Sequence, residues 1–253
     1  MNQFGNLYSQ YYDLLYSDKN YHAEIEYIDQ LIRVYGKKQA SALLDLGCGT
    51  GNHAELFCDK GYTVHGIDLS DDMLKIANTR RTGKEDRLIF SQSNITDLQL
   101  NKKFDVVVSL FHVMSYLNSN EDLIQAFKIA KQHLTTGGIF IFDFWYGPAV
   151  LTDLPTTRIK RLENNAIKVT RLAEPTLDAM KNIVDVHYDI FIEDKKTKEM
   201  TEKTELHKMR YLFDTELELL CSNADFEIVH KAVWMSDEKP NFSSWNVVWV
   251  LRN

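Results

Sequence analysis

A glycine-rich turn after a short apolar run constrains the fold of this chain more than any other feature. The apolar run 43–46 leads into a turn with glycines at positions 47, 49 and 51, and a second, strand-like run, 64–67, ends at Asp68. Glycine allows a tight turn and lets a ligand approach the backbone closely. A carboxylate at the tip of the neighbouring strand can accept hydrogen bonds from both hydroxyls of a ribose. The pair predicts a strand–helix–strand unit that binds a nucleoside cofactor.

The spacing of the glycines distinguishes between cofactors. A dinucleotide site uses G-x-G-x-x-G, which frees a helix N-terminus for a pyrophosphate. Here the register is G-x-G-x-G, and Asn52 stands in place of the third dinucleotide glycine. The string D-L-G-C-G-T-G resembles the first motif of class I S-adenosylmethionine-dependent methyltransferases, and Asp68 falls where their ribose-binding acid lies. The resemblance implies S-adenosyl-L-methionine as cofactor and S-adenosyl-L-homocysteine as product, and it disfavours NAD. The alternative is a glycine turn that only links a strand to a helix.

Composition narrows the class of protein. A chain of 253 residues is long enough for one large α/β domain with an insertion. The net charge is -7 and the basic residues are scattered along the chain, which weighs against a nucleic-acid substrate. Cys48, Cys58 and Cys221 lack metal-type spacing and indicate reduced thiols. No apolar run approaches the roughly 18 residues of a membrane span, so we expect a cytoplasmic protein with no membrane association.

Strands and helices alternate over the first 150 residues. Strands are expected near 42–47, 63–68, 88–93, 104–111 and 139–142. An amphipathic helix is expected before the first strand, Ser70 is expected to cap a later helix, and another helix should stop at Gly137 and Gly138. The pattern predicts an α/β fold with a doubly wound, mostly parallel seven-stranded sheet. The resemblance implies the Rossmann-like fold of class I methyltransferases, with two final strands near 227–234 and 245–251.

The residue pattern changes after about residue 155, where long, polar, strand-like runs replace the alternation of strands and helices. The runs 158–173, 180–194 and 199–213 are extended, and 194–198 has the composition of a hairpin tip. A helix capped by Asp214 should then resume the core. We expect one methyltransferase domain over 1–253, divided into N-terminal cover helices (1–40), a cofactor-binding core (41–154), an inserted antiparallel substrate lid (155–213) and a C-terminal part of the core (214–253). The lid is also the expected surface of a homodimer.

The N-terminal tyrosines resemble the cover segment of small-molecule methyltransferases, including enzymes that N-methylate amino sugars attached to nucleoside diphosphates. The resemblance implies that one tyrosine closes over the methionine end of the cofactor. Tyr12 is the first candidate, and Tyr8 or Tyr16 the next, these two also being candidates for substrate contact. The alternative is a helix that buries its tyrosines in a core.

Position relative to the expected strands identifies the remaining cofactor contacts. Met73 would lie on the adenine face, although it is also a plausible core residue. Asn94 stands where the family usually has an acid that binds the adenine amino group, and its side-chain oxygen can accept that hydrogen bond. The candidate cofactor residues are Tyr12, Asp45, Gly47, Cys48, Gly49, Gly51, Asp68, Leu69, Met73, Asn94, Ile95, Leu110 and Phe111.

The segment after the fourth strand is where acceptor chemistry is expected, because ligands in open α/β sheets sit beyond the carboxyl ends of the strands. Tyr116 could position an amine or hydroxyl, and His112 could take a proton near neutral pH, although His112 could equally be a supporting residue. Trp145 and Tyr146 are candidate substrate-binding aromatics, and aromatic residues fill cores equally often. Asp143 could be functional or only end its strand. No metal is expected, since His187 and His207 lack ligand spacing.

Three classes of function remain open. The leading one is methyl transfer to a small molecule, above all N-methylation of an amino sugar or nucleotide sugar, with O-methylation of another metabolite as its variant. The second is methylation of RNA or protein, disfavoured by the acidity and by the absence of an N-P-P-Y-type motif. The third is a non-catalytic S-adenosylmethionine-binding protein. Methyl transfer from a sulfonium depends mainly on alignment and exclusion of water, so a catalytic triad is not required.

Overall fold

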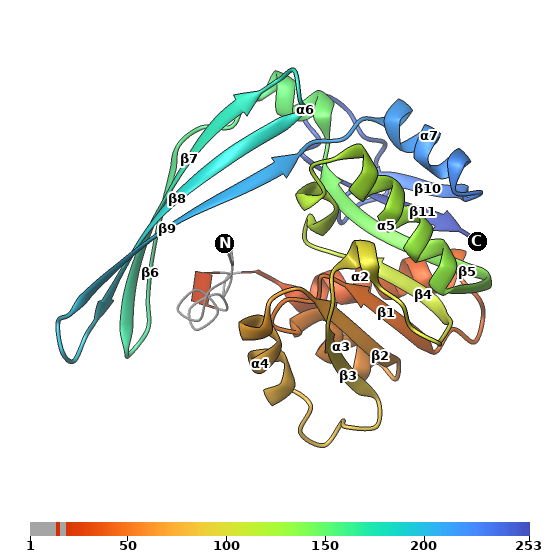
Figure 1. The fold of residues 1–253 in the computed structure, drawn as a ribbon, viewed down its shortest axis with the longest axis horizontal. Coiled ribbons are helices and arrows are strands. Elements are labelled where there is room, and N and C mark those ends of the chain that lie inside the picture. Colours follow the sequence, from red (N-terminus) through yellow and green to blue (C-terminus); the bar gives the residue numbers. More distant parts are fainter. Residues whose placement is uncertain (1–13, 16–18) are drawn as a thin grey trace.

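Seven strands form the central sheet of the computed structural model, which describes residues 14, 15 and 19–253 (Figure 1). The expected contacts Tyr8, Tyr12 and Tyr16 lie outside these residues. The strands are β1 (Ala42–Leu46), β2 (Thr63–Asp68), β3 (Leu88–Gln92), β4 (Phe104–Ser109), β5 (Leu134–Trp145), β10 (Glu227–Val233) and β11 (Asn246–Arg252). Their order is β10-β11-β5-β4-β1-β2-β3, and only β11 runs antiparallel to its neighbours β5 and β10. The predicted mostly parallel seven-stranded sheet is therefore confirmed.

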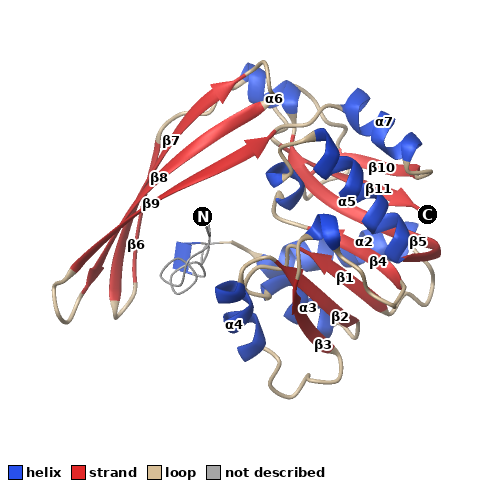
Figure 2. Cartoon of the chain, in the orientation of Figure 1, coloured by secondary structure: helices blue, strands red, loops and turns tan. Residues whose placement is uncertain are grey.

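Helices cover both faces of this sheet (Figure 2). They are α2 (Tyr21–Tyr35), α3 (Asn52–Asp59), α4 (Asp71–Thr79), α5 (Asn120–His133), α6 (Gly147–Thr152) and α7 (Asp214–Asn223), with two short 3-10 helices, η1 (Ile95–Asp97) and η2 (Val113–Tyr116). Side chains alternate along a strand, so Val106 packs in the cluster with α2 and α3 while Val107 packs in the cluster with α5 and α7. None of the helices in the described part of the chain is long and apolar enough to cross a bilayer.

The inserted segment forms a second, antiparallel sheet, as predicted. Its strands are β6 (Arg158–Glu163), β7 (Ile167–Asp178), β8 (Ile183–Asp194) and β9 (Met200–Arg210), paired in that order. Asp194 supports the expected hairpin tip by accepting hydrogen bonds from the backbone N–H groups of Lys196 and Thr197. The single run expected over 158–173 is in fact two strands, because Asn164 accepts hydrogen bonds from Ala166 and Ile167 and closes a turn. We call this four-stranded sheet the lid sheet.

Two apolar contacts hold the lid sheet against the core. Met73 of α4 and Leu15 pack with Val169 and Ile190 of the lid sheet. At the other end, Val150 of α6 packs with a group that includes residues of β8 and β9. The lid sheet thus stands beside the carboxyl ends of the core strands, with its concave side facing them (Figure 1).

Two expected helix boundaries are wrong. Helix α5 ends at His133, and Gly137 and Gly138 lie inside β5, because β5 already pairs with β4 at Leu134. Gly137 has a φ of 72° where the β4–β5 register shifts, so it shapes a strand irregularity instead of a helix end. Asp214 is the first residue of α7, which Phe213 precedes at the cap position without a side-chain hydrogen bond.

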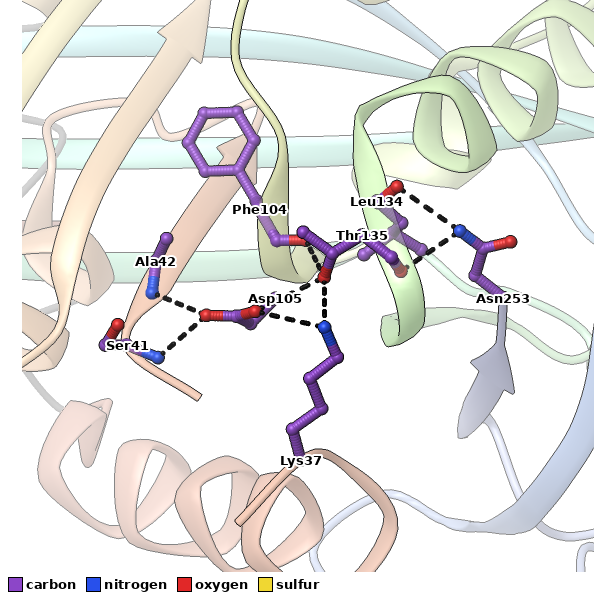
Figure 3. Close-up of polar contacts among 8 residues, drawn as sticks. All are labelled: Lys37, Ser41, Ala42, Phe104, Asp105, Leu134, Thr135 and Asn253. Carbon is purple, nitrogen blue, oxygen red and sulfur yellow. Dashed lines mark hydrogen bonds and ion pairs between the residues drawn. The ribbon is translucent and has the colours of Figure 1, made fainter. Parts of the chain in front are cut away.

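A polar network joins the strands at their amino ends, away from the lid sheet (Figure 3). Asp105 accepts hydrogen bonds from the backbone N–H groups of Ser41 and Ala42 and from the hydroxyl of Thr135. The ammonium group of Lys37 lies 3.5 Å from the same carboxylate. Burial alone would raise the pKa of Asp105, but the hydrogen bonds and Lys37 outweigh it and hold this pKa below its usual range. The network fixes β1, β4 and β5 relative to one another.

Candidate active site

One cavity of about 1170 Å³ lies between the carboxyl ends of the core strands and the lid sheet. The glycine turn and Asp68 line one end of it. The segment after β4 lines the middle, and residues of β6, β7, β8 and β9 line the other end. Ligands of open α/β sheets bind at this edge of the sheet, so the topology places the cavity where a cofactor and an acceptor could meet.

Two glycines of the turn face different surroundings. Gly49 has a φ of 55° and lines the cavity, and a Cβ atom added there would meet no atom within 4 Å. Gly51 has a φ of 80°, lies away from the cavity and precedes α3, and a Cβ there would lie 2.8 Å from the ring of Phe90. Gly49 therefore leaves room for a ligand, whereas Gly51 lets the turn pack against the sheet.

Two carboxylates lie near the glycine turn, and one of them supports it through hydrogen bonds. The side chain of Asp68 accepts hydrogen bonds from the backbone N–H groups of Gly49 and Ser70, each at 2.8 Å. Asp45 is buried, and its Oδ2 has no hydrogen-bond partner within the described residues. Burial, together with the charge of Asp68, raises the pKa of Asp45 to about 7. Burial also raises the pKa of Asp68, against the opposing effect of the backbone N–H groups.

The expected adenine contacts line the same end of the cavity. Leu69, Asn94 and Ile95 all line the cavity, and Leu69 is 66% exposed. The Oδ1 atom of Asn94 accepts a hydrogen bond from the backbone N–H of Thr96 and caps η1. The amide group of Asn94 therefore keeps its N–H groups for a ligand. Met73 reaches the cavity but is largely buried in the contact with the lid sheet.

The backbone after β4 adopts an uncommon conformation. Leu110, Phe111 and His112 line the cavity, and the last two have φ angles of 64° and 62°. Non-glycine residues adopt this left-handed region at a cost, which is characteristic of functional sites. Asp143 of β5 holds the strained segment: its Oδ2 accepts the backbone N–H of His112 at 3.1 Å and lies 2.7 Å from Nδ1 of the same residue. Asp143 is thus a supporting residue, a role that the sequence left open.

Tyr116 lies in η2 and lines the middle of the cavity. Its hydroxyl is 2.8 Å from Nδ1 of His207, which comes from β9 of the lid sheet. The other ring nitrogen of His207, Nε2, is 3.2 Å from Oε2 of Glu205. His207 and Glu205 had no role in the sequence interpretation, which considered His207 only as a metal ligand.

The two aromatic candidates near the end of β5 lie in different surroundings. Trp145 lines the cavity and packs edge-on against Trp245, with ring centroids 5.4 Å apart. Tyr146 is outside the cavity lining, its ring packs in the core cluster with Phe144, and its hydroxyl donates to Asp214 at 3.4 Å. Tyr146 thus lies outside the cavity that Trp145 lines, because successive residues of an extended segment face opposite sides.

The described part of the N-terminal segment also reaches the cavity. Tyr21 and His53 line it, and Nε2 of His53 lies 2.7 Å from Oε2 of Glu24. Lys19 pairs with the same carboxylate and places its ammonium group 4.0 Å from the ring centre of Phe111. Burial raises the pKa of Glu24, but His53 and Lys19 outweigh it and lower the pKa overall. Tyr21 belongs to the cover segment expected from the sequence, although the tyrosines chosen there precede it.

The lid sheet gives its end of the cavity a positive charge. The side chains of Arg158, Lys160 and Arg171 contribute positive charge from the face turned toward the core. We call them the cationic wall. They come from two strands, and only the pairing of β6 with β7 brings them to one surface. Lys208 is also among the lining residues, but it pairs with Asp185 on the face of the sheet opposite to His207. The described residues include no group of three or more metal-ligating side chains that could hold a metal ion.

Known proteins resemble part of this chain in sequence and nearly all of it in fold. Residues 43–138 match a family described as a methyltransferase domain. A dTDP-3-amino-3,4,6-trideoxy-alpha-D-glucopyranose N,N-dimethyltransferase from Streptomyces venezuelae is 36% identical over 144 residues, a match that covers 56% of this chain and only 59% of that relative.

Two solved structures resemble almost the whole chain. An S-adenosylmethionine-dependent methyltransferase from Clostridium acetobutylicum ATCC 824 has a TM-score of 0.82 at 22% identity and covers 96% of this chain and 95% of that one. Streptomyces venezuelae DesVI has a TM-score of 0.77 at 26% identity, with 94% and 95% covered. The sequence match is concentrated in the part with the glycine turn, whereas the structural match also extends over the lid sheet.

Proposed function

Because this chain belongs to the class I S-adenosylmethionine-dependent methyltransferases, we propose that it transfers the methyl group of S-adenosylmethionine to the amino group of a sugar carried by a nucleoside diphosphate. The observation that carries the proposal is the single cavity that joins the glycine turn to the cationic wall. A relative that acts on a dTDP-amino sugar supports the same acceptor class.

The residues at the glycine-turn end suit the cofactor. Asp68 sits at the tip of β2, where its carboxylate can accept the ribose hydroxyls, and Leu69 offers an exposed apolar side chain to the adenine. The unpartnered Oδ2 of the buried Asp45 would gain from a nearby positive charge, which both the sulfonium and the ammonium group of S-adenosylmethionine carry. When bound, this cofactor supplies an already activated methyl group.

The residues at the other end suit the acceptor. Tyr116, His112 and Trp145 surround the middle of the cavity, where the nucleophile would meet the methyl group. The cationic wall lies beyond them and can bind the phosphates of a nucleotide sugar, since guanidinium and ammonium groups form charge-assisted hydrogen bonds with phosphate. The chain then has to align the amine with the methyl group, exclude water and keep the amine unprotonated.

Calorimetry tests cofactor binding. S-adenosylhomocysteine should bind saturably and NAD should not. The variant Asp68→Ala should lose about 1.5–3 kcal/mol of binding free energy, the scale for charge-assisted hydrogen bonds. Asp71→Ala is the matched control, since Asp71 lies three residues away, is exposed and pairs only with Lys75 in the described contacts. Saturable NAD binding without S-adenosylhomocysteine binding would refute the cofactor assignment.

Mass spectrometry tests the acceptor. The protein should add one or two methyl groups to dTDP-3-amino-3,4,6-trideoxyglucose and none to the analogue with a hydroxyl in place of the amine. Methylation of the hydroxyl analogue alone would indicate an O-methyltransferase, and methylation of neither would refute this acceptor class. Replacing Arg158 and Arg171 together by Gln should raise KM for the amino-sugar nucleotide about ten- to a hundredfold and leave S-adenosylhomocysteine affinity unchanged.

His112 and Tyr116 are the proposed catalytic residues. His112→Asn removes the imidazole but keeps a residue that tolerates the left-handed backbone, so a fall in kcat would report the ring and not the fold. Tyr116→Phe should lower kcat while S-adenosylhomocysteine affinity holds. A homodimer through the lid sheet and a cytoplasmic location are further predictions, checked by light scattering and by cell fractionation.

A further inference from the structure

Four polar side chains form a continuous group that runs from the cavity along the core-facing side of the lid sheet. The hydroxyl of Tyr116 is 2.8 Å from Nδ1 of His207, Nε2 of His207 is 3.2 Å from Oε2 of Glu205, and Oε1 of Glu205 is 2.6 Å from Nζ of Lys203. Lys203, Glu205 and His207 alternate along β9, so all three share the face that is turned toward the core.

The two central members of this group, His207 and Glu205, are buried. His207 is 3% exposed and Glu205 is 8% exposed, and the ring of Tyr188 packs perpendicular to the imidazole at 4.8 Å. Burying a carboxylate, an imidazole and an ammonium group in one place is costly unless each is paired. A simple anchor between lid sheet and core would need only an apolar contact, and Met73 and Val150 already provide such contacts.

The order of the partners fixes the proton on the imidazole. The carboxylate of Glu205 forms an ion pair with Lys203 at 2.6 Å, and a carboxylate can only accept a hydrogen bond. Nε2 of His207 must therefore carry its proton and donate it to Glu205, which leaves Nδ1 as an acceptor. Tyr116 then donates its hydroxyl proton to Nδ1, so toward every other group its oxygen acts as a hydrogen-bond acceptor.

We propose that His207, oriented by Glu205, makes Tyr116 a proton acceptor for the substrate amine. This inference rests on the proposed function. As the protonated amine, in its ammonium form, gives up a proton, one N–H bond breaks and an O–H bond forms at Tyr116, while the former hydroxyl proton of Tyr116 moves to Nδ1 of His207. The imidazolium that results is paired with the carboxylate of Glu205. The amine lone pair is thereby freed to attack the methyl group. Tyr116 is the catalytic residue, and His207 and Glu205 are positioning residues.

Nuclear magnetic resonance tests the proton assignment without any acceptor. The full chain, labelled with nitrogen-15 at histidine and saturated with S-adenosylhomocysteine, should show His207 as the Nε2–H tautomer at pH 8. Its signals are identified by their loss in His207→Gln. In Glu205→Gln the amide can donate to Nε2, so the population should move toward the Nδ1–H tautomer. An Nδ1–H tautomer in the wild-type protein would overturn the proposal, because Tyr116 would then donate into the cavity.

A double-mutant cycle tests the route of the proton, with dTDP-3-amino-3,4,6-trideoxyglucose as the probe. His207→Gln should lower kcat about tenfold or more in the wild-type background and less than about twofold in the Tyr116→Phe background, because both changes interrupt the same relay. An equal loss in both backgrounds would mean that His207 only braces the lid sheet, and it would overturn the proposal.

The controls separate this inference from the proposed function. His187 lies on β8 of the same sheet, is exposed, and faces away from the core, so His187→Gln should retain wild-type kcat. If the wild-type protein does not methylate the probe, the proposed function fails, while the tautomer measurement still decides the arrangement of Tyr116, His207 and Glu205.

Discussion

Gly49 and Gly51 look equivalent in the sequence, but the structure gives them different tasks. Both have positive φ angles, and only Gly49 faces the cavity. The motif therefore combines one residue that leaves space for a ligand with another that allows close packing on Phe90. Sequence spacing predicted the turn correctly, yet it could not distinguish the two roles, because the contact with Phe90 joins residues distant in the chain.

The two glycines predict different variants. Gly51→Ala should lower the free energy of unfolding by about 2–4 kcal/mol, since it adds a clash to the left-handed backbone. Gly49→Ala should lower it by only about 1–2 kcal/mol, because its methyl group enters open space. The order reverses for the ligand: Gly49→Ala should weaken S-adenosylhomocysteine binding more. Thermal unfolding and calorimetry measure the two effects, and equal stabilities for both variants would contradict this division.

Asp45 predicts a pH dependence of stability. Its folded pKa is raised to about 7, above the roughly 3.9 of an unfolded aspartate, so its contribution is fully present below about pH 4 and is lost as the pH rises to about 7. Without cofactor, Asp45→Asn should therefore be more stable than wild type by roughly 2–4 kcal/mol at pH 8, and the gap should close as the pH falls toward 4.

Denaturant unfolding at several pH values measures this gap for Asp45→Asn. Under the proposed cofactor assignment, the same substitution should weaken S-adenosylhomocysteine binding, since it removes the negative charge proposed to attract the ammonium group of the cofactor. Parallel stability curves for the two proteins at all pH values would show that the buried carboxylate is not strained. The residue thus exchanges stability of the empty protein for ligand binding.

At the scale of elements, the sequence predicted the core better than the lid sheet. Alternating apolar patterns and caps such as Ser70 act locally, and the strands and helices they predict are present. The end of α5 was misplaced because the pairing of Leu134 with β4 outweighs the local signal of Gly137 and Gly138. The contact between Tyr116 and His207 could not be predicted, because it depends on which face of β9 meets η2.

The Asp105 network predicts acid sensitivity of the core strands. The pKa of Asp105 is lowered in the folded protein. The stabilisation from its carboxylate is therefore present above the unfolded pKa of about 4 and is lost as the pH falls through the folded pKa. Asp105→Ala should cost about 1–3 kcal/mol of unfolding free energy at pH 7, because two backbone N–H groups lose their acceptor. The deficit should shrink below pH 4.

Urea unfolding at pH 7 and pH 3 checks this deficit, with Lys37→Ala as the comparison. Lys37 lies 3.5 Å from the carboxylate and is partly exposed, so its loss should cost less than the loss of Asp105. A deficit for Asp105→Ala that stays constant with pH would show that the carboxylate charge does not stabilise these strands.

At the scale of the whole molecule, the cavity exists only because two sheets face each other. The core supplies the glycine turn, and the lid sheet supplies the cationic wall. The sequence predicted an antiparallel insertion and placed it over the core as a lid. It gave no sign that the insertion carries a positive surface, since that charge is assembled from separate strands.

Removing the lid sheet should separate binding from transfer. Replacing 157–208 by a short flexible linker leaves Arg210, which pairs with Asn120 and Glu216, in place. S-adenosylhomocysteine should still bind, within about tenfold of wild type, whereas methyl transfer should fall at least about a hundredfold through loss of acceptor contacts and entry of water. Wild-type turnover by the shortened protein would show that the lid sheet is dispensable.

The lid sheet occupies one uninterrupted stretch of the polypeptide, with both of its ends on the same side of the core. Separate segments of the gene therefore encode the two halves of the cavity. A recombination event that replaced this one passage would deliver a new acceptor preference to an unaltered methyl-donor module, provided that the incoming strand offered a partner to Tyr116. Enzymes that descend from one ancestor would in this way acquire different substrates by exchanging the segment that encodes the lid sheet.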